Sequence, residues 1–244
     1  MVEQFINTLI LHMDDDSNRH IKEPIRYLEI GVDTGNTWTQ ILTTTPKGRE
    51  VIKVGVDPYG KYTDGITRMT SQMFFAINEG FQKQEFDIIY IDACHFSYIV
   101  DQEVAESFKI LRKNGIVLLD DTIPLEEASG TVHAEDLVSY CDKVSYPIGI
   151  DHTEAVQEFS GYPHVQGDVW KSVAKLRMKN PELSICSIGS LCTTMIMRGK
   201  QDLMEKVADE DINWDFYLKN NKEILQQVKV WDDINHYLNA NYQP

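Results

Sequence analysis

The residues with the clearest chemical meaning are one acid and two glycines that follow a short apolar segment. Residues 27–35 read Tyr-Leu-Glu-Ile-Gly-Val-Asp-Thr-Gly, which includes Glu29, Gly31 and Gly35. Glycine adopts backbone angles that are closed to other residues and lets a ligand lie against the main chain. A second turn, Gly-Val-Asp-Pro, places Asp57 directly after the next apolar segment. A carboxylate at that position can accept hydrogen bonds from both hydroxyl groups of a ribose. Together the two turns predict a site for an adenosine-containing cofactor.

The spacing of the glycines differs from the dinucleotide fingerprint Gly-x-Gly-x-x-Gly. Here the pattern is Glu29-x-Gly31-x-x-x-Gly35, and its carboxylate would repel a pyrophosphate but could receive a cationic amino group or sulfonium. A tight strand-to-helix turn in another α/β protein would explain the glycines alone, and the position of Asp57 argues against that interpretation. The pattern resembles that of class I S-adenosylmethionine-dependent methyltransferases, so we expect S-adenosylmethionine as the cofactor.

Three further acids come at the ends of two apolar segments. Asp92 ends the segment 86–92, and Asp120 and Asp121 end the segment that begins at Ile116. If both segments are parallel strands, the three acids meet at one edge of a sheet and repel one another unless a cation or protons neutralise them. Carboxylate oxygens suit magnesium, with water and substrate completing the shell. The acids therefore predict a Mg²⁺ site. In the alternative, Asp120 caps a loop, Asp121 is solvated and Asp92 contacts only the cofactor.

One histidine lies where it could act on a substrate. His95 follows Asp92 by three residues, in the loop above the predicted strand end. A lone histidine is more often structural than catalytic. Its place beside the cofactor site favours a role as a general base, because the ordinary pKa of histidine, near 6.5, suits proton transfer at neutral pH.

Several segments resemble a bacterial group of class I methyltransferases that is associated with sugar and polysaccharide modification. They are Met69-Thr70-Ser71-x-x-Phe74-Phe75, residues 86–98, residues 111–117, residues 167–171 and residues 216–225. The resemblance implies cofactor contacts for Thr70, Ser71 and Asp92. Ala93 departs from the group, which usually has glycine there, and Asp120-Asp121 replaces a more common His-Asp. Paired acids at this point resemble the macrocin-type O-methyltransferases that act on macrolide sugars, which implies the same positions as metal ligands.

The elements that must position these residues alternate along the chain. We expect strands at 26–31, 51–56, 66–69, 86–92, 116–120, 183–188 and 192–197, and helices within 1–14, 36–44, 71–81 (capped by Ser71), 97–113 (closed by Asn114-Gly115) and 169–178. This alternation predicts a Rossmann-like, doubly wound α/β fold: a mostly parallel sheet with an antiparallel last strand and helices on both faces. We expect a single domain over residues 1–244. Prolines, glycines and histidines at 122–167 indicate a substrate-covering insertion, and residues 203–240 a helical tail.

Composition excludes several classes of partner. The chain has 244 residues, 42% of them hydrophobic, and a formal charge of −15, so a phosphate backbone would meet no basic face. No apolar run approaches the length of a membrane span, and no leader pattern is present. The four cysteines lack zinc-like spacing. We therefore expect a cytoplasmic protein with reduced thiols, no nucleic-acid or membrane partner, and a small-molecule acceptor, and we leave a homo-oligomer open.

These features together favour a methyltransferase that acts on an oxygen of a small polar acceptor, with a sugar hydroxyl as the preferred candidate. Magnesium would lower the pKa of the acceptor hydroxyl, and His95, or Asp92 in its place, would remove its proton. Two alternatives remain open. One is N-methylation of an amino sugar, which needs no metal. The other is a cofactor-binding subunit without catalytic activity, although intact Glu29, Gly31, Gly35 and Asp57 count against loss of cofactor binding.

Overall fold

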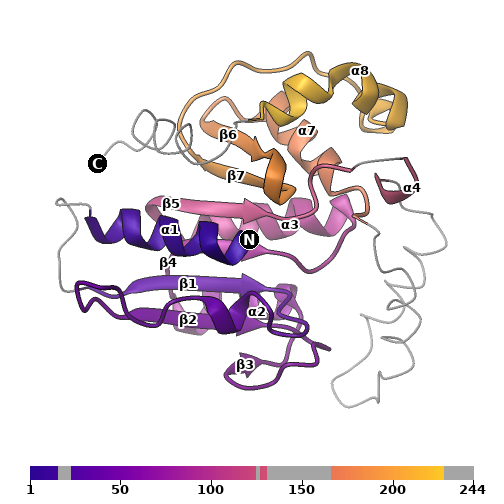
Figure 1. Cartoon of the computed structure of the whole chain (residues 1–244). Coiled ribbons are helices and arrows are strands. Elements are labelled where there is room, and N and C mark those ends of the chain that lie inside the picture. Colours follow the sequence, from indigo (N-terminus) through magenta and orange to yellow (C-terminus); the bar gives the residue numbers. More distant parts are fainter. Residues whose placement is uncertain (16–22, 125–126, 131–165, 228–244) are drawn as a thin grey trace.

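The computed structural model describes residues 1–15, 23–124, 127–130 and 166–227, which build a seven-stranded sheet (Figure 1). The strands are β1 (Ile25–Ile30), β2 (Val51–Val56), β3 (Ile66–Thr67), β4 (Phe86–Ile91), β5 (Leu111–Leu119), β6 (Leu183–Ile188) and β7 (Thr193–Arg198). The helices are α1 (Val2–Asp15), α2 (Ser71–Ile77), α3 (Ser97–Ile110), α4 (Glu127–Gly130), α7 (Val169–Lys179) and α8 (Trp214–Leu225).

The strand order is β3-β2-β1-β4-β5-β7-β6. Strands β3, β2, β1, β4 and β5 pair in parallel, whereas β7 is antiparallel to both of its neighbours. The chain therefore winds outward in both directions from the β1/β4 pair, and in such sheets ligands bind where the order reverses. The predicted fold class, including the antiparallel hairpin of the last two strands, is confirmed.

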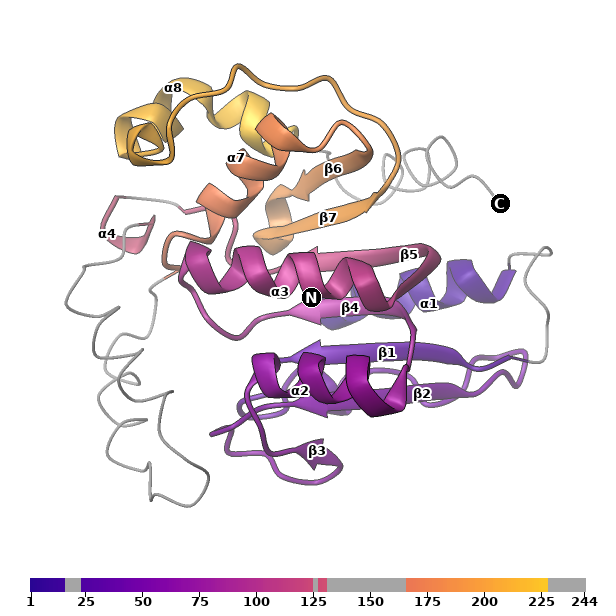
Figure 2. The same ribbon diagram turned by 180° about the vertical axis from the view of Figure 1, so that it is seen from behind.

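Helices cover both faces of the sheet, and each face has its own hydrophobic core. Successive side chains of a strand point to opposite faces of the sheet. Tyr27 of β1 therefore belongs to the core beneath α1, and its neighbour Leu28 belongs to the core beneath α2, α3 and α7. Figures 1 and 2 show α1 on one face and α2 and α3 on the other. The α1 side chains buried on their face are Phe5, Ile6, Leu9, Ile10 and Met13.

The helix expected at 36–44 is wrong. Only a 3₁₀ turn, Trp38–Gln40, forms there, and the chain then enters an extended stretch that pairs Thr44 with Glu50. Threonines at 43–45 followed by proline disfavour a helix in this segment. The face that this helix would have covered is instead covered by α1, whose apolar side packs in the same core as Trp38.

The end of α3 also differs from its prediction. The helix ends at Ile110, because Leu111 is already extended and pairs with Phe86 of β4. Asn114 has a φ of +65° inside β5, where the β4–β5 register shifts. The Asn-Gly pair therefore makes an irregularity in a strand rather than a helix cap, since Asn and Gly tolerate left-handed angles in both settings.

Most of the predicted insertion lies outside the described residues, as do His133, His152 and His164 and the end of the tail from residue 228. Within the described part, α4 follows β5, and α8 is preceded by the short turn Asp209–Asp211. No helix in this part is long and apolar enough to cross a membrane.

A fully buried arginine holds the tail against the sheet. In α7, Arg177 Nε donates to the carbonyl of Ile224 at 3.0 Å, and Nη2 donates to the carbonyl of Ile185 at 2.7 Å. Nη1 donates to Gln201 Oε1 at 2.9 Å. One guanidinium thus joins α7, β6 and the end of α8, and its planar fork provides donors in three directions.

We expect Arg177→Met to lower the free energy of unfolding by about 2–4 kcal/mol, because buried carbonyls lose charged donors. Urea unfolding followed by tryptophan fluorescence measures this change. The exposed variant Lys219→Met in α8 is the matched control and should stay within about 0.5 kcal/mol of wild type. A loss below about 1 kcal/mol in Arg177→Met would contradict the anchoring role.

Candidate active site at the carboxyl edge of the sheet

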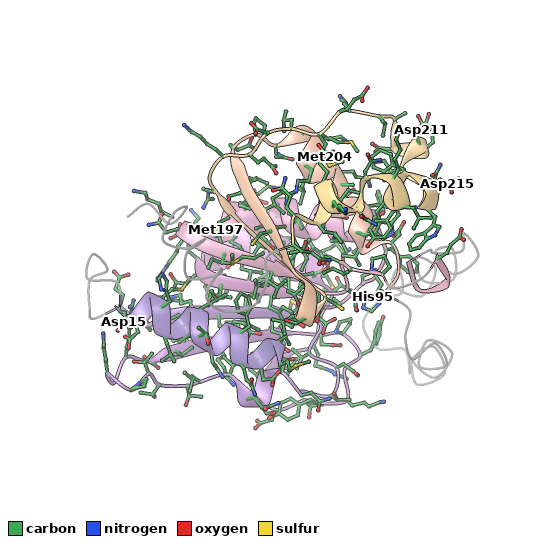
Figure 3. All side chains as sticks on the ribbon, turned by 45° about the horizontal axis from the view of Figure 1, so that its top comes forward. Asp15, His95, Met197, Met204, Asp211 and Asp215 are labelled. Carbon is green, nitrogen blue, oxygen red and sulfur yellow. The ribbon has the colours of Figure 1, made fainter. Side chains whose placement is uncertain are left out.

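The parallel strands deliver the predicted acids to one edge. Backbone hydrogen bonds continue the ladders past the strand ends, from Asp92 N to Ile30 O at 2.9 Å and from Asp120 N to Ile91 O at 3.0 Å. Glu29 lies near the end of β1, opposite Tyr90 of β4. In Figure 3, Asp15, the last residue of α1, lies at the left of the molecule, and His95 lies far from it, to the right of the centre. The candidate site therefore lies at the carboxyl ends of the strands.

The two loop glycines are required by close packing as well as by backbone angle. Gly31 has a φ of +88°, and a Cβ there would lie 2.0 Å from the carbonyl oxygen of Asp92. Gly35 has a φ of +77°, and a Cβ there would lie 2.6 Å from the ring of Tyr62. A side chain at Gly31 would push apart the loops that follow β1 and β4. Only glycine combines this angle with this proximity.

Asp57 joins the loops that follow β1 and β2. Its Oδ2 accepts a hydrogen bond from Asp33 N at 2.8 Å, and its Oδ1 accepts hydrogen bonds from Tyr59 N at 2.7 Å and from Gly60 N. The side chain is buried. Three backbone amides therefore use much of the hydrogen-bonding capacity of this carboxylate. Its expected role in binding a ribose stays a prediction.

At the start of α2 the structure corrects the predicted cap. The N-cap is Thr70, whose Oγ1 accepts from Met73 N at 3.3 Å, and Ser71 is the first helical residue. Ser71 is buried and hydrogen-bonds Glu103 of α3. Burial raises the pKa of Glu103 to about 7, and the bond to Ser71 opposes this rise. The predicted cofactor contacts of Thr70 and Ser71 stay predictions.

Glu29 is a buried carboxyl group that is protonated near neutral pH. Burial is the main cause that raises its pKa to about 8, and the charge of Asp92 adds to the shift. The Tyr27 hydroxyl donates to Glu29 Oε2 at 2.6 Å and opposes the rise. A cation bound beside this group would lower its pKa and favour the ionised form.

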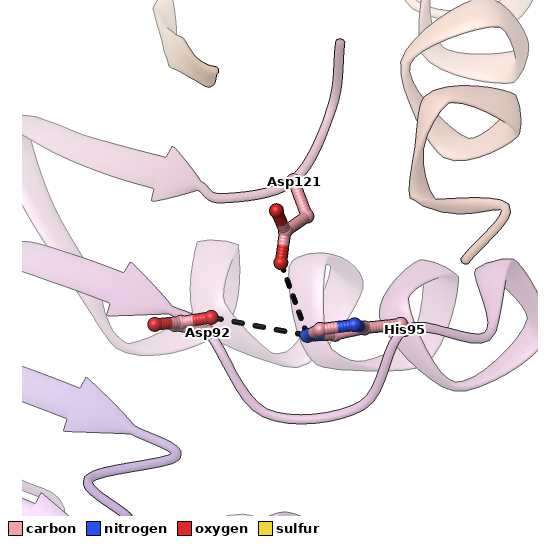
Figure 4. Close-up of side chains that lie close together, drawn as sticks. All are labelled: Asp92, His95 and Asp121. Carbon is pink, nitrogen blue, oxygen red and sulfur yellow. Dashed lines mark ion pairs between the residues drawn. The ribbon is translucent and has the colours of Figure 1, made fainter. Parts of the chain in front are cut away.

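Three of the predicted residues form a compact polar cluster. His95 Nε2 lies 3.2 Å from Asp121 Oδ2 and 3.9 Å from Asp92 Oδ1, and Figure 4 shows both carboxylates beside this one imidazole nitrogen. Atoms of all three side chains that could ligate a metal ion lie within 4.8 Å of one another. The side chains are 28–35% exposed, so a ligand can reach them.

Asp121 adopts an unusual backbone conformation at this cluster, with a φ of +56°. Asp and Asn are the non-glycine residues that tolerate this region best, and such angles concentrate at functional sites. Burial raises the pKa of Asp121, and the neighbouring His95 opposes the rise.

Asp120 lies beside the cluster but is engaged by protein hydroxyls. Its Oδ2 accepts a hydrogen bond from the Tyr90 hydroxyl, and its Oδ1 accepts one from Thr193 Oγ1 at 2.8 Å. Burial and the charge of Asp92 raise its pKa to about 6. Tyr90 also donates to Asp92 Oδ2 at 3.2 Å, so one phenol links the ends of β4 and β5.

Sequence reasoning missed Tyr90 and Thr193. A signal for the tyrosine exists, because Tyr27-x-Glu29 and Tyr90-x-Asp92 share a two-residue spacing that puts hydroxyl and acid on the same side of a strand. Thr193 gave no such signal, because β7 reaches Asp120 only through the antiparallel pairing with β5.

Comparisons with known proteins agree with this architecture. Residues 28–122 match the family model described as a methyltransferase domain. This segment contains the second half of β1, the whole of β2, β3, β4 and β5, and the Asp92–His95–Asp121 cluster. A search of curated proteins found no match.

Solved structures give distant similarities. An O-methyltransferase from Bacillus cereus in complex with SAH is 15% identical, with 80% of this chain and 78% of that chain covered and a TM-score of 0.46. The MycE methyltransferase from the mycinamycin biosynthetic pathway, in complex with Mg, SAH and mycinamycin VI, is also 15% identical, with a TM-score of 0.43. That match covers 84% of this chain, which spans 52% of the length of MycE.

The strand order, the glycine loop after β1 and the family match concern the same part of the molecule. The order β3-β2-β1-β4-β5-β7-β6 is that of a doubly wound sheet with its ligand edge at the ends of β1 and β4. The part of the fold that carries the candidate site, residues 28–122, therefore matches a methyltransferase domain.

Proposed function

We propose that the protein transfers a methyl group from S-adenosylmethionine to an oxygen of a small polar acceptor, and we favour a sugar hydroxyl in glycan or natural-product biosynthesis. The single observation that carries this proposal is the Asp92–His95–Asp121 cluster, which is accessible and lies next to the glycine loop after β1. A base and two acids at that place can prepare a hydroxyl group for attack on a methyl group.

The residues at the ends of β1 and β2 fit the proposed cofactor. The buried carboxyl of Glu29 would pair with the cationic amino group of the methionine moiety. Asp57 would accept the ribose hydroxyls with lone pairs that its three backbone donors leave unused. S-adenosylmethionine, when bound, supplies an electrophilic methyl group, and the protein supplies orientation for in-line attack.

On the acceptor side, His95 is the proposed general base. Its Nε2 lies within hydrogen-bond distance of Asp121, which would stabilise the imidazolium that forms when the acceptor proton is taken. Asp92, at the end of β4, lies between the cofactor loop and this pair. In this proposal the electrophile lies at the ends of β1 and β2, and the nucleophile lies at the ends of β4 and β5.

The donor set fits a divalent cation. Asp92 and Asp121 offer hard carboxylate oxygens of the kind that magnesium prefers, and water and acceptor would complete its shell. Asp120 stays a predicted third ligand, and it would use lone pairs that Tyr90 and Thr193 leave free. A bound cation lowers the pKa of an acceptor hydroxyl.

N-methylation of an amino sugar is the second candidate, and the same acids favour it. Two carboxylates at the acceptor side can bind an ammonium group directly, without a metal ion. A chelator distinguishes the two candidates, because only the O-methyl mechanism uses the cation to activate the acceptor.

The first prediction here concerns the ribose contact. Asp57→Asn keeps an oxygen acceptor for the loop amides, whereas Asp57→Ala removes it; both remove the charge offered to the ribose. We expect weaker binding of S-adenosylhomocysteine by about 1.5–3 kcal/mol in Asp57→Ala, measured by calorimetry, and a smaller loss in Asp57→Asn. Unchanged affinity in both variants, or tighter binding of NAD, would contradict the cofactor assignment.

The second prediction follows from the raised pKa of Glu29. At pH 7 the free protein holds a proton on Glu29, because the pKa is about 8. An ammonium bound beside it lowers this pKa, so binding of S-adenosylhomocysteine should release up to about one proton. Calorimetry in buffers with different ionisation enthalpies counts the proton, and Glu29→Gln should abolish the release. Binding enthalpies that are the same in all buffers would remove Glu29 from the amino-group site.

The third prediction tests the reaction itself. Labelled S-adenosylmethionine is offered to a panel of nucleotide sugars and glycans, with magnesium or with EDTA. We expect an O-methylated product that EDTA abolishes, and Asp121→Asn should need a higher magnesium concentration than wild type. Asp15→Asn, far from His95 in Figure 3, is the charge-matched control. Full activity in EDTA would favour N-methylation, and transfer to no acceptor would favour the subunit without catalytic activity.

A further inference from the structure

The short segment Gln166–Asp168, which we call the return segment, leads into α7 and lies against the loop that carries His95. The backbone N of Asp168 donates to the carbonyl oxygen of His95 at 2.9 Å. Its carboxylate Oδ1 accepts from the backbone N of Ser97 at 2.6 Å. One aspartate therefore holds the chain on both sides of Phe96, directly after the imidazole.

Gly167 allows this close approach. It has a φ of +60°, and a Cβ at this position would lie 1.9 Å from the His95 carbonyl oxygen and 2.5 Å from the His95 Cβ. No residue with a side chain could occupy this position without displacing the His95 loop. The contact is specific to His95, because its own backbone and Cβ are the atoms that Gly167 touches.

The N-terminus of α3 depends on the same aspartate. Phe96 takes the N-cap position and provides no side-chain hydrogen bond to the first turn. Helix starts leave backbone N–H groups without a partner in the helix; Ser, Thr, Asp and Asn side chains are the preferred acceptors, and a negative charge is favourable there. Asp168, from a distant part of the sequence, thus acts as the cap, and Ser172 of α7 adds a bond from its hydroxyl to Ser97 O at 3.1 Å.

Gln166, at the other end of the return segment, contacts the loop that carries Asp121. Gln166 Nε2 donates to the carbonyl of Ile123 at 3.1 Å, and the Gln166 side chain hydrogen-bonds the Asp121 carboxylate. The return segment therefore contacts both loops that bring His95 and Asp121 together.

We propose that Asp168 is a positioning residue for methyl transfer: by holding His95 O and Ser97 N it fixes the loop that sets the His95–Asp121 contact of 3.2 Å. This inference rests on the proposed role of His95 as the base. Asp168 is not among the residues proposed to contact the cofactor or the acceptor. Its Oδ2 is 3.1 Å from Lys171 Nζ, so the carboxylate is held at both oxygens.

The experiment is a double-mutant cycle. Single-turnover methyl transfer is measured at saturating S-adenosylmethionine, with the nucleotide sugar of highest turnover in the panel above. The proteins are wild type, Asp168→Ala, His95→Ala and the double variant. We expect Asp168→Ala to slow the step about 10- to 100-fold in wild type, since small displacements of a reacting group have effects of this size. In the His95→Ala background it should cause no further loss. Affinity for S-adenosylhomocysteine should stay within twofold.

Two controls separate positioning from general stability. Asp168→Asn keeps an acceptor for Ser97 N and should restore the rate to within about threefold of wild type. Asn213→Ala removes a comparable cap, the 3.0 Å bond from Phe216 N to Asn213 Oδ1 at α8. It should lower Tm by a few degrees, as Asp168→Ala does, with an unchanged rate. Hydrogen exchange of the Ser97 amide should accelerate in Asp168→Ala alone among these three single variants.

The outcomes identify which idea fails. If His95→Ala reacts within a few-fold of wild type, the proposed base is wrong and the positioning role falls with it. Two other outcomes would overturn only this inference, provided that His95→Ala is slow. Either Asp168→Ala reacts at the wild-type rate, or it slows the His95→Ala protein as much as it slows wild type. In both cases Asp168 does not act through His95. If Asp168→Ala does not fold, Ser97→Pro removes the same donor from a first helical position that tolerates proline, and the same rates decide.

Discussion

Mutual repulsion among carboxylates constrains every loop at the carboxyl edge of the sheet. The acids whose carboxyl groups are described there include Glu29, Asp57, Asp92, Asp120 and Asp121. The protein relieves the repulsion in different ways. It keeps one proton on the buried carboxyl of β1, gives Asp57 three backbone donors, and gives Asp120 two hydroxyl donors. Asp92, which accepts from Tyr90, and Asp121, which hydrogen-bonds Gln166, are the acids that also face His95, and these three residues form the candidate active site.

Two buried tyrosine hydroxyls also reduce the repulsion among these carboxylates. Tyr27 and Tyr90 lie on neighbouring strands, and each donates to an acid two residues further along its own strand. A hydroxyl group provides a donor without adding a positive charge, so the edge stays acidic. An acidic edge suits a cationic sulfonium or amino group on one side and a divalent cation or an ammonium on the other. Cofactor and acceptor chemistry therefore use the same excess of negative charge.

Packing far from this edge determines how firmly its loops are held. The loop after β1 can approach the loop after β4 only because Gly31 has no side chain, and the His95 loop is approached in the same way by Gly167. Arg177 of α7 attaches the end of α8 to β6. The site is thus held by contacts between segments that lie far apart in the sequence, which is why we expect its geometry to respond to substitutions outside it.

The sequence by itself determined the doubly wound sheet, the glycine loop and the placement of Asp92, Asp120 and Asp121 at one edge, because β-strand patterns and turn residues are local signals and parallel strands share one edge. Only the tertiary structure put His95, rather than Asp120, in the compact cluster with Asp92 and Asp121. The sequence also carried the Tyr-x-acid spacing. It misplaced a helix at 36–44 and the end of α3, where α1 and the pairing of Leu111 with Phe86 prevailed over local preference. Only the tertiary structure showed that Thr193 binds Asp120 and that Asp168 caps α3. Each of these contacts joins residues more than 70 positions apart, and no local pattern in a sequence encodes such a distance.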